Sequence, residues 1–368
     1  MAKTVGVFCP TLHNYGGGEF VSVAIANTLA QNGYDVTLFT TKPVDAKSVK
    51  NFFGETLHPK ISAVTQPTSL NIKGLMGFYQ NVFRSYIAKT KTTVFIDPYS
   101  NCVFPWTNVC YIHFPTLNRT AYRTRFPYLQ SIHHTEVGAL PQVIMEKNLA
   151  TYDDKLVLAN SHYTAHEIEA FSGKKAHVLY PPYTSSIKNF VAQTKQDLVV
   201  TTSRFEQNKK LEKIPKIAAK TSSHVQFAVI GRLYDKAILG HLQAQVKKLG
   251  LTERVKFYPD LPAKQKLQML ATAKVYLHTM VGEHFGISIV EAMASGCIPV
   301  SHNSGGMVEF VPAENRYETV EQAAGIINSA IGGWSEDKTV EPKQIAEQFS
   351  INNFSCRFME LFSKYEAF

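Results

Sequence analysis

The sequence predicts an α/β protein with two parallel, doubly wound sheets, and three observations support this prediction. Short apolar runs alternate with helical patterns over residues 3–184, and the same alternation starts again at residue 197. Such alternation is typical of parallel sheets that are covered by helices on both faces. A polar segment, residues 185–196, separates the two halves. Finally, a chain of 368 residues is too long for one ordinary core and suits two domains of roughly 180 residues each.

The first half begins with a βαβ unit that carries three glycines after its first strand. Residues 3–9 are predicted to form a buried strand, and a helix after the glycines leads to a second strand at 34–41. Gly16, Gly17 and Gly18 therefore lie at the carboxyl end of a strand, where open α/β sheets bind ligands. Glycines there let the backbone come close to a ligand, although a tight connection is an equally good interpretation. The motif is neither a G-x-G-x-x-G fingerprint nor a P-loop.

Residues 71–91 show apolar side chains at helical spacing. This pattern predicts a helix that packs on the sheet and turns a basic face outward. The alternative is a helix that lies in the plane of a membrane surface. The apolar positions are Ile72, Leu75, Met76, Tyr79, Val82, Phe83, Tyr86 and Ile87, and the basic residues Lys73, Arg84, Lys89 and Lys91 fall largely off that stripe.

The rest of the first half contains one candidate ligand contact, His113. It ends a predicted strand, where its ring is well placed to bind a sugar hydroxyl, although a lone histidine is more often structural. Strands are predicted at 92–97, 108–113, 154–160 and 178–180, and a helix capped by Ser161 is predicted at 162–171.

The second half repeats the pattern and places two cations after its first strand. Arg204 and Lys209 follow that strand, where two positive charges are able to hold a diphosphate. The alternative is a solvated helix start, and Lys210 replaces Lys209 if the register slips by one residue. Strands are predicted at 197–203, 225–231, 255–261, 274–280 and 297–301, and helices at 210–222, 236–249, 262–273, 286–295, 319–331 and 342–365.

Two glutamates eight positions apart lie within the most distinctive stretch, residues 280–309. Glu283 is predicted on a loop, and Glu291 in the second turn of a helix that starts near Gly286. A helix N-terminus beneath a glycine-bearing loop suits an anion, and carboxylates suit the hydroxyls of sugars and ribose. Ser304 and the two glycines after it start another such turn. The simpler interpretation is that both glutamates are solvated surface charges.

This stretch closely resembles the E-x7-E region of family 4 retaining glycosyltransferases, which have the GT-B fold. The resemblance implies that Glu283 contacts the donor sugar and that Glu291 binds the ribose. It also implies that Arg204 and Lys209 hold the diphosphate, and that the C-terminal helix crosses back to the first domain. The loop residues that would lie against sugar and phosphate are His284, Phe285, Gly286 and Ile287. The expected segments are a domain at 1–184, a linker at 185–196, a nucleotide-sugar domain at 197–345 and the returning helix at 346–368.

The phrases CYIHFPTL and VLYPPYT resemble segments of the mannosyltransferases that extend dolichol-linked oligosaccharides from GDP-mannose. The resemblance implies a retaining transfer of mannose to a glycan or lipid-linked acceptor. No residue stands out as a covalent nucleophile. Neither a D-x-D pair at a strand's carboxyl end nor a His/Cys cluster with ligand spacing is found, so we expect a metal-independent reaction without a cofactor. The alternatives are a UDP-sugar enzyme with a soluble acceptor and a non-catalytic nucleotide-sugar or polyanion binder.

The charge distribution predicts an anionic partner for the first half. The net charge is +9, and residues 56–135 carry most of it. No apolar run is long enough to span a bilayer, and the N-terminus does not resemble a signal peptide. We therefore expect a cytoplasmic protein that binds peripherally to an anionic membrane, and no nucleic-acid module is recognised. The cations in this region are Lys60, Lys73, Arg84, Lys89, Lys91, Arg119, Arg123 and Arg125, against the single acid Asp97.

Overall fold

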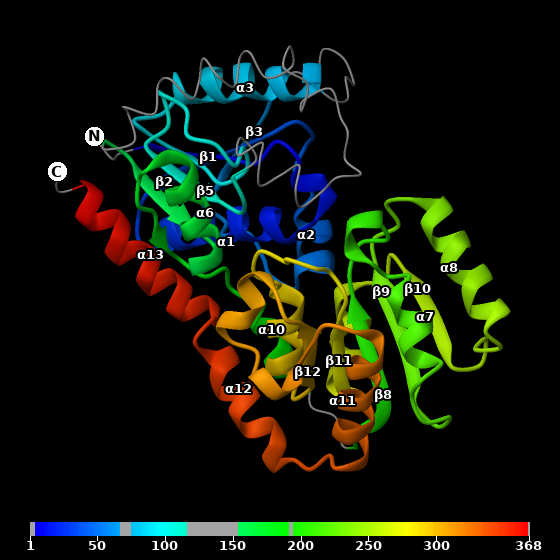
Figure 1. Cartoon of the computed structure of the whole chain (residues 1–368). Helices are drawn as coiled ribbons and strands as arrows, with labels where there is room; N and C mark the ends of the chain where they lie inside the picture. Colours follow the sequence, from blue (N-terminus) through cyan, green and yellow to red (C-terminus); the bar gives the residue numbers. More distant parts are fainter. Residues whose placement is uncertain (1–3, 67–74, 116–153, 191–193, 367–368) are drawn as a thin grey trace. The chain divides into compact units, whose positions relative to one another are not determined.

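The computed structural model describes residues 4–66, 75–115, 154–190 and 194–366, and its helices and strands are drawn in Figure 1. The chain divides into two compact units. Unit 1 contains Met1–Pro182 together with Ile351–Phe368, and unit 2 contains Tyr183–Ser350. The boundaries expected from the sequence are residues 184 and 346. Each unit has its own parallel sheet with helices packed against it, so the predicted α/β class is confirmed.

In the described part of unit 1, seven parallel strands form one sheet in the order β3-β2-β1-β4-β5-β6-β7. The chain moves outward from β1 to β3 and then returns to β4 on the other side of β1. Ligands of open α/β sheets bind at the carboxyl ends of the strands next to such a reversal. The strands are β1 Thr4–Phe8, β2 Asp35–Thr40, β3 Ser62–Thr65, β4 Val94–Asp97, β5 Val109–Ile112, β6 Leu156–Ala159 and β7 His177–Val178.

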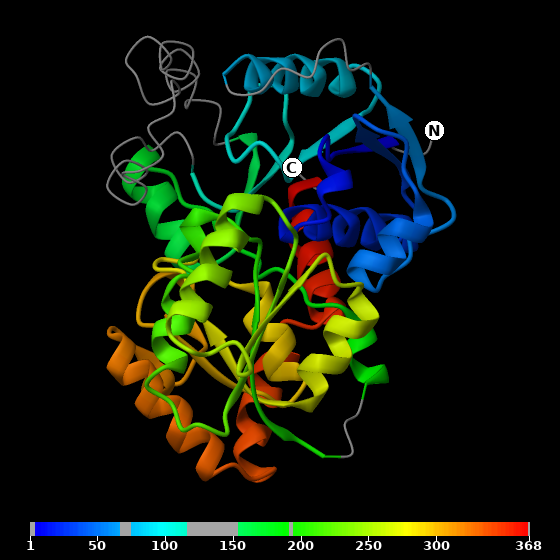
Figure 2. The same ribbon diagram turned by 90° about the vertical axis from the view of Figure 1, so that its right-hand side faces the viewer.

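Helices cover both faces of this sheet, with α3 on one face and α1 and α13 on the other (Figures 1 and 2). The last helix belongs to unit 1, because Thr28 and Ser355 share a hydrogen bond of 2.8 Å and Tyr34 donates to Glu366 over 2.8 Å. The predicted return of the C-terminal helix is therefore confirmed. The helices are η1 Leu12–Asn14, α1 Gly17–Gln31, α2 Ala46–Phe53, α3 Leu75–Lys89, α6 His162–Ser172 and α13 Ile351–Glu366.

The predicted packing of α3 on the sheet is confirmed, but the outward face of its described side chains is apolar and not basic as predicted. Ser85 and Ala88 are the fully buried residues there, whereas Phe83, Tyr86 and Ile87 are exposed. Small side chains let the helix come close to the strands, and of the apolar stripe Val82 packs against the buried pair Cys102 and Phe104. Residues 67–74, which include Lys73, lie outside the described residues.

In the described part of unit 2, six parallel strands form a sheet in the order β10-β9-β8-β11-β12-β13. The reversal of strand order lies between β8 and β11, so the loops after these strands meet at one edge. The strands are β8 Gln196–Thr202, β9 Gln226–Gly231, β10 Val255–Pro259, β11 Ala273–His278, β12 Ile298–His302 and β13 Arg316–Tyr317. The helices are η4 Ser185–Asn189, η5 Gln207–Lys209, α7 Lys213–Ala218, α8 Lys236–Lys248, α9 Ala263–Thr272, α10 Ile287–Ala294, η6 Gly305–Glu309, η7 Ala313–Asn315, α11 Val320–Gly332, η8 Asp337–Thr339 and α12 Val340–Glu347.

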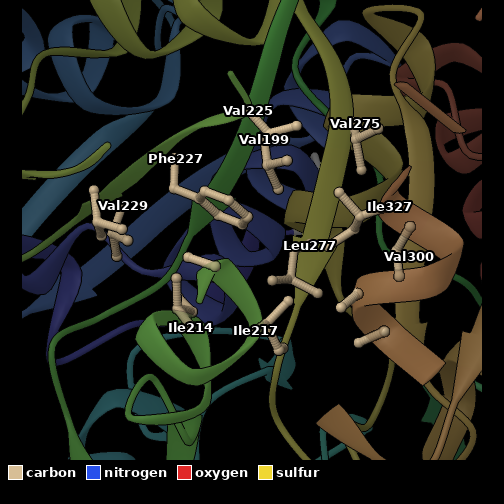
Figure 3. Close-up of a cluster of buried hydrophobic side chains, with 14 of the residues drawn as sticks. Val199, Ile214, Ile217, Val225, Phe227, Val229, Val275, Leu277, Val300 and Ile327 are labelled. Atoms are coloured by element: carbon tan, nitrogen blue, oxygen red, sulfur yellow. The ribbon is translucent and has the colours of Figure 1, made fainter. Parts of the chain in front are cut away.

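The core of unit 2 holds the sheet rigid beneath those loops (Figure 3). Strand residues such as Val199, Phe227 and Val275 meet Ile217 of α7 and Ile327 of α11, and all of them are almost fully buried. Because close-packed cores resist deformation, the strand ends are fixed platforms for the loops that follow them. The predicted elements of this half are present. However, the helix expected at 342–365 is two helices, α12 and α13, which belong to different units.

Candidate functional site

Glu283 is the centre of a buried charge cluster in unit 2. It lies on the loop between β11 and α10, as predicted, and its side chain is only 13% exposed. Its Oε2 accepts from the Nζ of Lys209 over 2.8 Å and lies 3.2 Å from the Nε2 of His278. The backbone N–H of His284 donates to Oε1 over 3.2 Å. Burial acts to raise the pKa of Glu283, but the charge of Lys209 and the hydrogen bond from His278 outweigh it and hold the pKa well below its ordinary value.

The loop that carries Glu283 is held against the next strand end by glycines. Gly305 has a φ of 74°, and a Cβ there would lie 2.1 Å from the backbone oxygen of Glu283. The N–H of Gly306 donates to that same oxygen over 2.8 Å. The N–H of Gly282 donates to Ser304 Oγ, also over 2.8 Å. The two glycine turns that the sequence analysis placed at consecutive strand ends therefore contact each other directly.

The sequence analysis did not single out His278, the last residue of β11. Its side chain is 4% exposed, and its backbone carbonyl accepts from the hydroxyl of Tyr317 over 2.9 Å. Within the described residues its Nδ1 is buried without a hydrogen-bond partner. Like His113, His278 is a histidine at the carboxyl end of a strand, so the same sequence pattern could have indicated it. With Lys209, His278 fixes the orientation of the Glu283 carboxylate.

Lys209, and not Lys210, points its ammonium group into this cluster. Its Nζ also lies 3.2 Å from the sulfur of Met280, and Thr279 donates to its backbone carbonyl over 2.8 Å. Lys210 follows with a φ of 53°, which ends the short η5 helix. The lysine that pairs with Glu283 is therefore Lys209, as predicted, and not the replacement Lys210. The alternative interpretation of Lys209 as part of a solvated helix start is wrong.

Arg204 lies after β8 but contacts a different set of side chains. Its guanidinium pairs with Glu206 over 2.8 Å and lies 5.4 Å from the centre of the Tyr234 ring. Its side chain is 45% exposed, so it is accessible to an anionic ligand. The backbone passes this point closely, because a Cβ on Gly231 would lie 1.5 Å from the carbonyl oxygen of Ser203. That position accepts only glycine.

Glu291 is buried in the second turn of α10, as predicted, and it has a partner that the sequence did not indicate. Its Oε2 accepts from the Nζ of Lys266 over 2.7 Å, and the two side chains are 9% and 17% exposed. Lys266 comes from α9. The interpretation of Glu283 and Glu291 as solvated surface charges is therefore wrong, since both carboxylates are buried and paired with lysines.

In the rest of the predicted loop, the side chain of Phe285 is buried in the core and Gly286 forms a backbone turn. Phe285 is 2% exposed, and its ring centroid lies 5.1 Å from that of Phe310 and 5.2 Å from that of Phe349. Its side chain is core, so only its backbone is placed to meet a ligand. Gly286 has a φ of 95° and starts α10 ahead of Ile287. The left-handed conformation there requires glycine.

In unit 1, His113 and the glycine turn lie beside each other at the carboxyl ends of the strands. A Cβ on Gly18 would lie 3.1 Å from His113 Nε2, and Gly17 begins α1. The same nitrogen lies 3.2 Å from the carbonyl oxygen of Pro98. Burial lowers the pKa of His113 to about 4, although the Pro98 carbonyl opposes that shift, so the ring is neutral at pH 7. A role in binding sugar stays a prediction.

The predicted basic surface of unit 1 is only partly described. Arg119, Arg123 and Arg125, like Lys73, lie outside the described residues. Arg84 donates to Asn81 Oδ1 over 2.9 Å. Lys89 donates to the carbonyl oxygen of Thr93 over 2.9 Å, and burial lowers its pKa. Lys91 is exposed just after the end of α3.

Two kinds of feature are absent from the described residues. No group of three or more His, Cys, Asp or Glu residues in the described ranges is arranged to hold a metal ion. No helix within those ranges is long and apolar enough to span a bilayer. The metal independence expected from the sequence stays a prediction.

The family model of glycosyl transferases group 1 matches residues 184–348. This segment of the chain is therefore similar to a group 1 glycosyl transferase domain. The segment contains Arg204, Lys209, Glu283 and Glu291, together with the newly found partners Lys266 and His278. The resemblance that the sequence analysis drew from the E-x7-E region is therefore confirmed.

Several mannosyltransferases are similar to the chain in sequence. The GDP-Man:Man(3)GlcNAc(2)-PP-Dol alpha-1,2-mannosyltransferase of Dictyostelium discoideum is 24% identical over 327 residues, 74% of this chain and 64% of that protein. The human protein of the same name is 26% identical over 53% of this chain and 46% of its own length. The alpha-1,3/1,6-mannosyltransferase of Candida glabrata is 24% identical over 95% of this chain and 87% of its own length. The chain thus spans less than two thirds of the first two relatives.

Solved glycosyltransferase structures have the same fold. Anabaena HepE in complex with UDP and glucose superposes with a TM-score of 0.72 at 18% identity, over 98% of this chain and 100% of that one. WaaG, a glycosyltransferase of lipopolysaccharide biosynthesis, superposes with a TM-score of 0.73 at 13% identity, over 97% and 98% of the two chains. The GT-B fold expected from the sequence is confirmed. The cleft expected between its two domains stays a prediction.

Proposed function

We propose that the protein is a retaining glycosyltransferase that moves mannose from GDP-mannose to a lipid-linked oligosaccharide. The buried pair of Lys209 and Glu283, inside the segment that is similar to a group 1 glycosyl transferase domain, carries this proposal. The names of the relatives support the donor and the acceptor, since they are mannosyltransferases whose names specify GDP-mannose and a dolichol-linked acceptor. No cofactor is part of the proposal, because the donor itself supplies the leaving group.

The roles of the residues follow from their charges and positions. Glu283 is held ionised and oriented by Lys209 and His278, so it is ready to accept hydrogen bonds from sugar hydroxyls. Glu291, eight positions further along the chain, accepts hydrogen bonds from the ribose hydroxyls in the same way. The backbone from His284 to Ile287, at the start of α10, is placed to meet the sugar and the phosphates.

The reaction also requires positive charge at the site, because the departing nucleotide gains negative charge. Bond cleavage at the anomeric carbon moves an electron pair onto the phosphate oxygen, and positive charge near that oxygen stabilises the transition state. Arg204 and Lys209 supply this charge in the proposal. The acceptor hydroxyl attacks from the face that the phosphate leaves, which retains the configuration, and the departing phosphate takes the hydroxyl proton.

Nucleotide release is the direct test of this function. The protein is incubated with GDP-mannose, UDP-glucose or UDP-N-acetylglucosamine and a lipid-linked oligosaccharide, and the released nucleotide is measured. We expect acceptor-dependent release of GDP from GDP-mannose that persists in excess EDTA. Release of UDP with a soluble acceptor would establish the alternative enzyme, and binding without turnover would establish the non-catalytic alternative. Loss of activity in EDTA that Mg²⁺ restores would contradict metal independence.

We also propose that the protein works peripherally at the cytoplasmic face of an anionic membrane. A lipid-linked acceptor lies at such a surface, and residues 56–135 contain eight cations and one acid. Each cation near an anionic surface contributes about 1 kcal/mol, so a few are enough for reversible binding. Binding to anionic vesicles at low salt, and not to neutral ones, is the expected observation.

A further inference from the structure

The described part of α3 exposes a stripe of large apolar side chains. Phe83, Tyr86 and Ile87 are 64%, 51% and 37% exposed. Their spacing of three and four residues places them on one side of the helix. Monomeric soluble proteins rarely leave such residues together on one helix face, so this stripe is a candidate contact surface.

The stripe is fixed in its outward orientation by contacts on the opposite side. Trp106 donates from Nε1 to Ser85 Oγ over 3.0 Å, and its ring stacks on Phe104 with centroids 4.9 Å apart. Tyr86, itself a member of the stripe, makes a T-shaped contact with the same indole at a centroid distance of 5.4 Å. Rotating α3 to bury Phe83 would break the bond between Trp106 and Ser85. The helix therefore presents an apolar ridge, formed by Phe83, Tyr86 and Ile87, on the side that faces away from Ser85.

The charged residues next to the ridge in the sequence are positive. Arg84 is the neighbour of Phe83 on the helix, and Lys91 is exposed just after it. The only acid between residues 56 and 135 is Asp97, which is 1% exposed and accepts from the N–H groups of Tyr99 and Ser100. Apolar and aromatic side chains flanked by cations match the boundary between anionic headgroups and acyl chains.

We propose that Phe83, Tyr86 and Ile87 insert into an anionic lipid surface, with α3 lying in the membrane plane. The inference rests on the proposed function, because the lipid-linked acceptor brings the protein to a membrane. It differs from electrostatic attraction by the cations alone, since apolar insertion persists when salt screens the charges. A second copy of the chain is a poorer occupant. In a two-fold contact the Arg84 residues flanking the two ridges would face like charges.

Vesicle partitioning of three variants tests the insertion. In the first, Phe83, Tyr86 and Ile87 are all replaced by Ser. In the second, Arg84 and Lys91 are replaced by Gln. The matched control is Leu249→Ser, which removes a 42% exposed apolar residue at the end of α8 in unit 2. Phosphatidylcholine vesicles with and without phosphatidylserine are used at low and high salt, and each variant must first melt cooperatively.

We expect the unmodified protein and the Leu249 control to bind the anionic vesicles and to stay partly bound at high salt. The serine variant should partition about tenfold less or weaker still, with no high-salt fraction left. The glutamine variant should lose mainly the salt-sensitive part. In a Phe83→Trp variant with Trp334 replaced by Phe and Trp106 kept, lipids brominated on the acyl chain should quench more fluorescence than in the Trp334→Phe parent, whose only tryptophan is Trp106.

Equal vesicle binding by the serine variant and the unmodified protein would overturn the inference. So would a ridge-dependent dimer in sedimentation equilibrium together with no more quenching in the Phe83→Trp variant than in its parent, because another copy would then cover the ridge. Turnover of GDP-mannose is measured in parallel. If vesicle binding follows the ridge while no nucleotide is released, the proposed function fails alone. If nucleotide is released normally while vesicles are ignored, the inference fails alone.

Discussion

Lys209 Nζ and Glu283 Oε2 lie 2.8 Å apart in the buried charge cluster of unit 2, where the two side chains are 14% and 13% exposed. The two residues come from the loops after β8 and β11, the strands between which the order of the sheet reverses. A salt bridge taken out of water in this way adds little net stability, because desolvation offsets the attraction. We infer that the pair exists for the chemistry at this sheet edge.

The Lys209→Met variant should therefore leave a buried carboxylate without its cation. We expect it to lose about 3 kcal/mol of unfolding free energy, because the buried carboxylate keeps only its contacts with His278 and the His284 N–H and loses its lysine. Turnover should fall more than GDP affinity, since leaving-group charge grows in the transition state. Urea denaturation and nucleotide release measure the two effects. Lys210→Gln is the matched control, and an equal loss in that variant would contradict the assigned register.

Glu291 and Lys266 allow the ribose contact to be separated from the ion pair. Glu291→Gln should weaken GDP binding about tenfold, because a lost hydrogen bond to a charged group costs about 1.5 kcal/mol. Lys266→Met keeps the carboxylate and should weaken binding less. Glu283→Gln should spare GDP binding while turnover falls. Calorimetry measures the GDP affinity of each variant. Equal losses of affinity in the Glu291 and Lys266 variants would show that Glu291 supports the structure and does not contact the ribose.

The sequence predicted the positions of Glu283 and Glu291 because both are set by local signals. Glycines at residues 282, 286 and 296 delimit a loop and a short helix, and the structure has these elements. The partners of the two glutamates were not predictable in this way. Lys266 lies 25 positions from Glu291, and Lys209 lies 74 positions from Glu283. Only the strand order brings such residues together, and no local pattern encodes that order.

The error over α3 has a different origin. Helical spacing shows that one side of a helix is apolar, but it does not show which side meets the sheet. Ser85 and Ala88 meet it, because small side chains allow close approach to the strands. Phe83, Tyr86 and Ile87 on the apolar side are therefore exposed, and the proposed contact with a membrane is argued from this exposure.

His113 should make the stability of unit 1 depend on pH. Its pKa is lowered to about 4 in the folded protein, mainly by burial. The unfolded chain therefore binds more protons between its ordinary pKa near 6.5 and pH 4, so stability falls as the pH is lowered through this range. The shift corresponds to a loss on the order of 3 kcal/mol. Urea denaturation of His113→Asn should show a flatter pH profile.

The same variant decides between the two interpretations of His113. The contact with the Pro98 carbonyl favours a structural role. Unchanged turnover at pH 7 in a folded His113→Asn protein would establish that role, whereas a raised KM for the acceptor would support the predicted sugar contact. A pH profile as steep as that of the unmodified protein would show that His113 does not titrate as described.

Gly305 links the two glycine turns, and its replacement should affect both stability and activity. In Gly305→Ala the residue would keep a φ of 74°, which costs a non-glycine residue about 1 kcal/mol. Its Cβ would also lie 2.1 Å from the carbonyl oxygen of Glu283, so the loop that carries the carboxylate must move. We expect a total loss of about 2 kcal/mol or more of unfolding free energy and a turnover at least tenfold lower in the protein that remains folded.

Gly240→Ala is the matched control, because no atom lies within 4 Å of a Cβ at that position in α8. Alanine there should raise the unfolding free energy by about 1 kcal/mol. Thermal unfolding and GDP-mannose turnover are measured for both. A Gly305→Ala protein with normal stability and full activity would show that the contact between the two turns does not position Glu283.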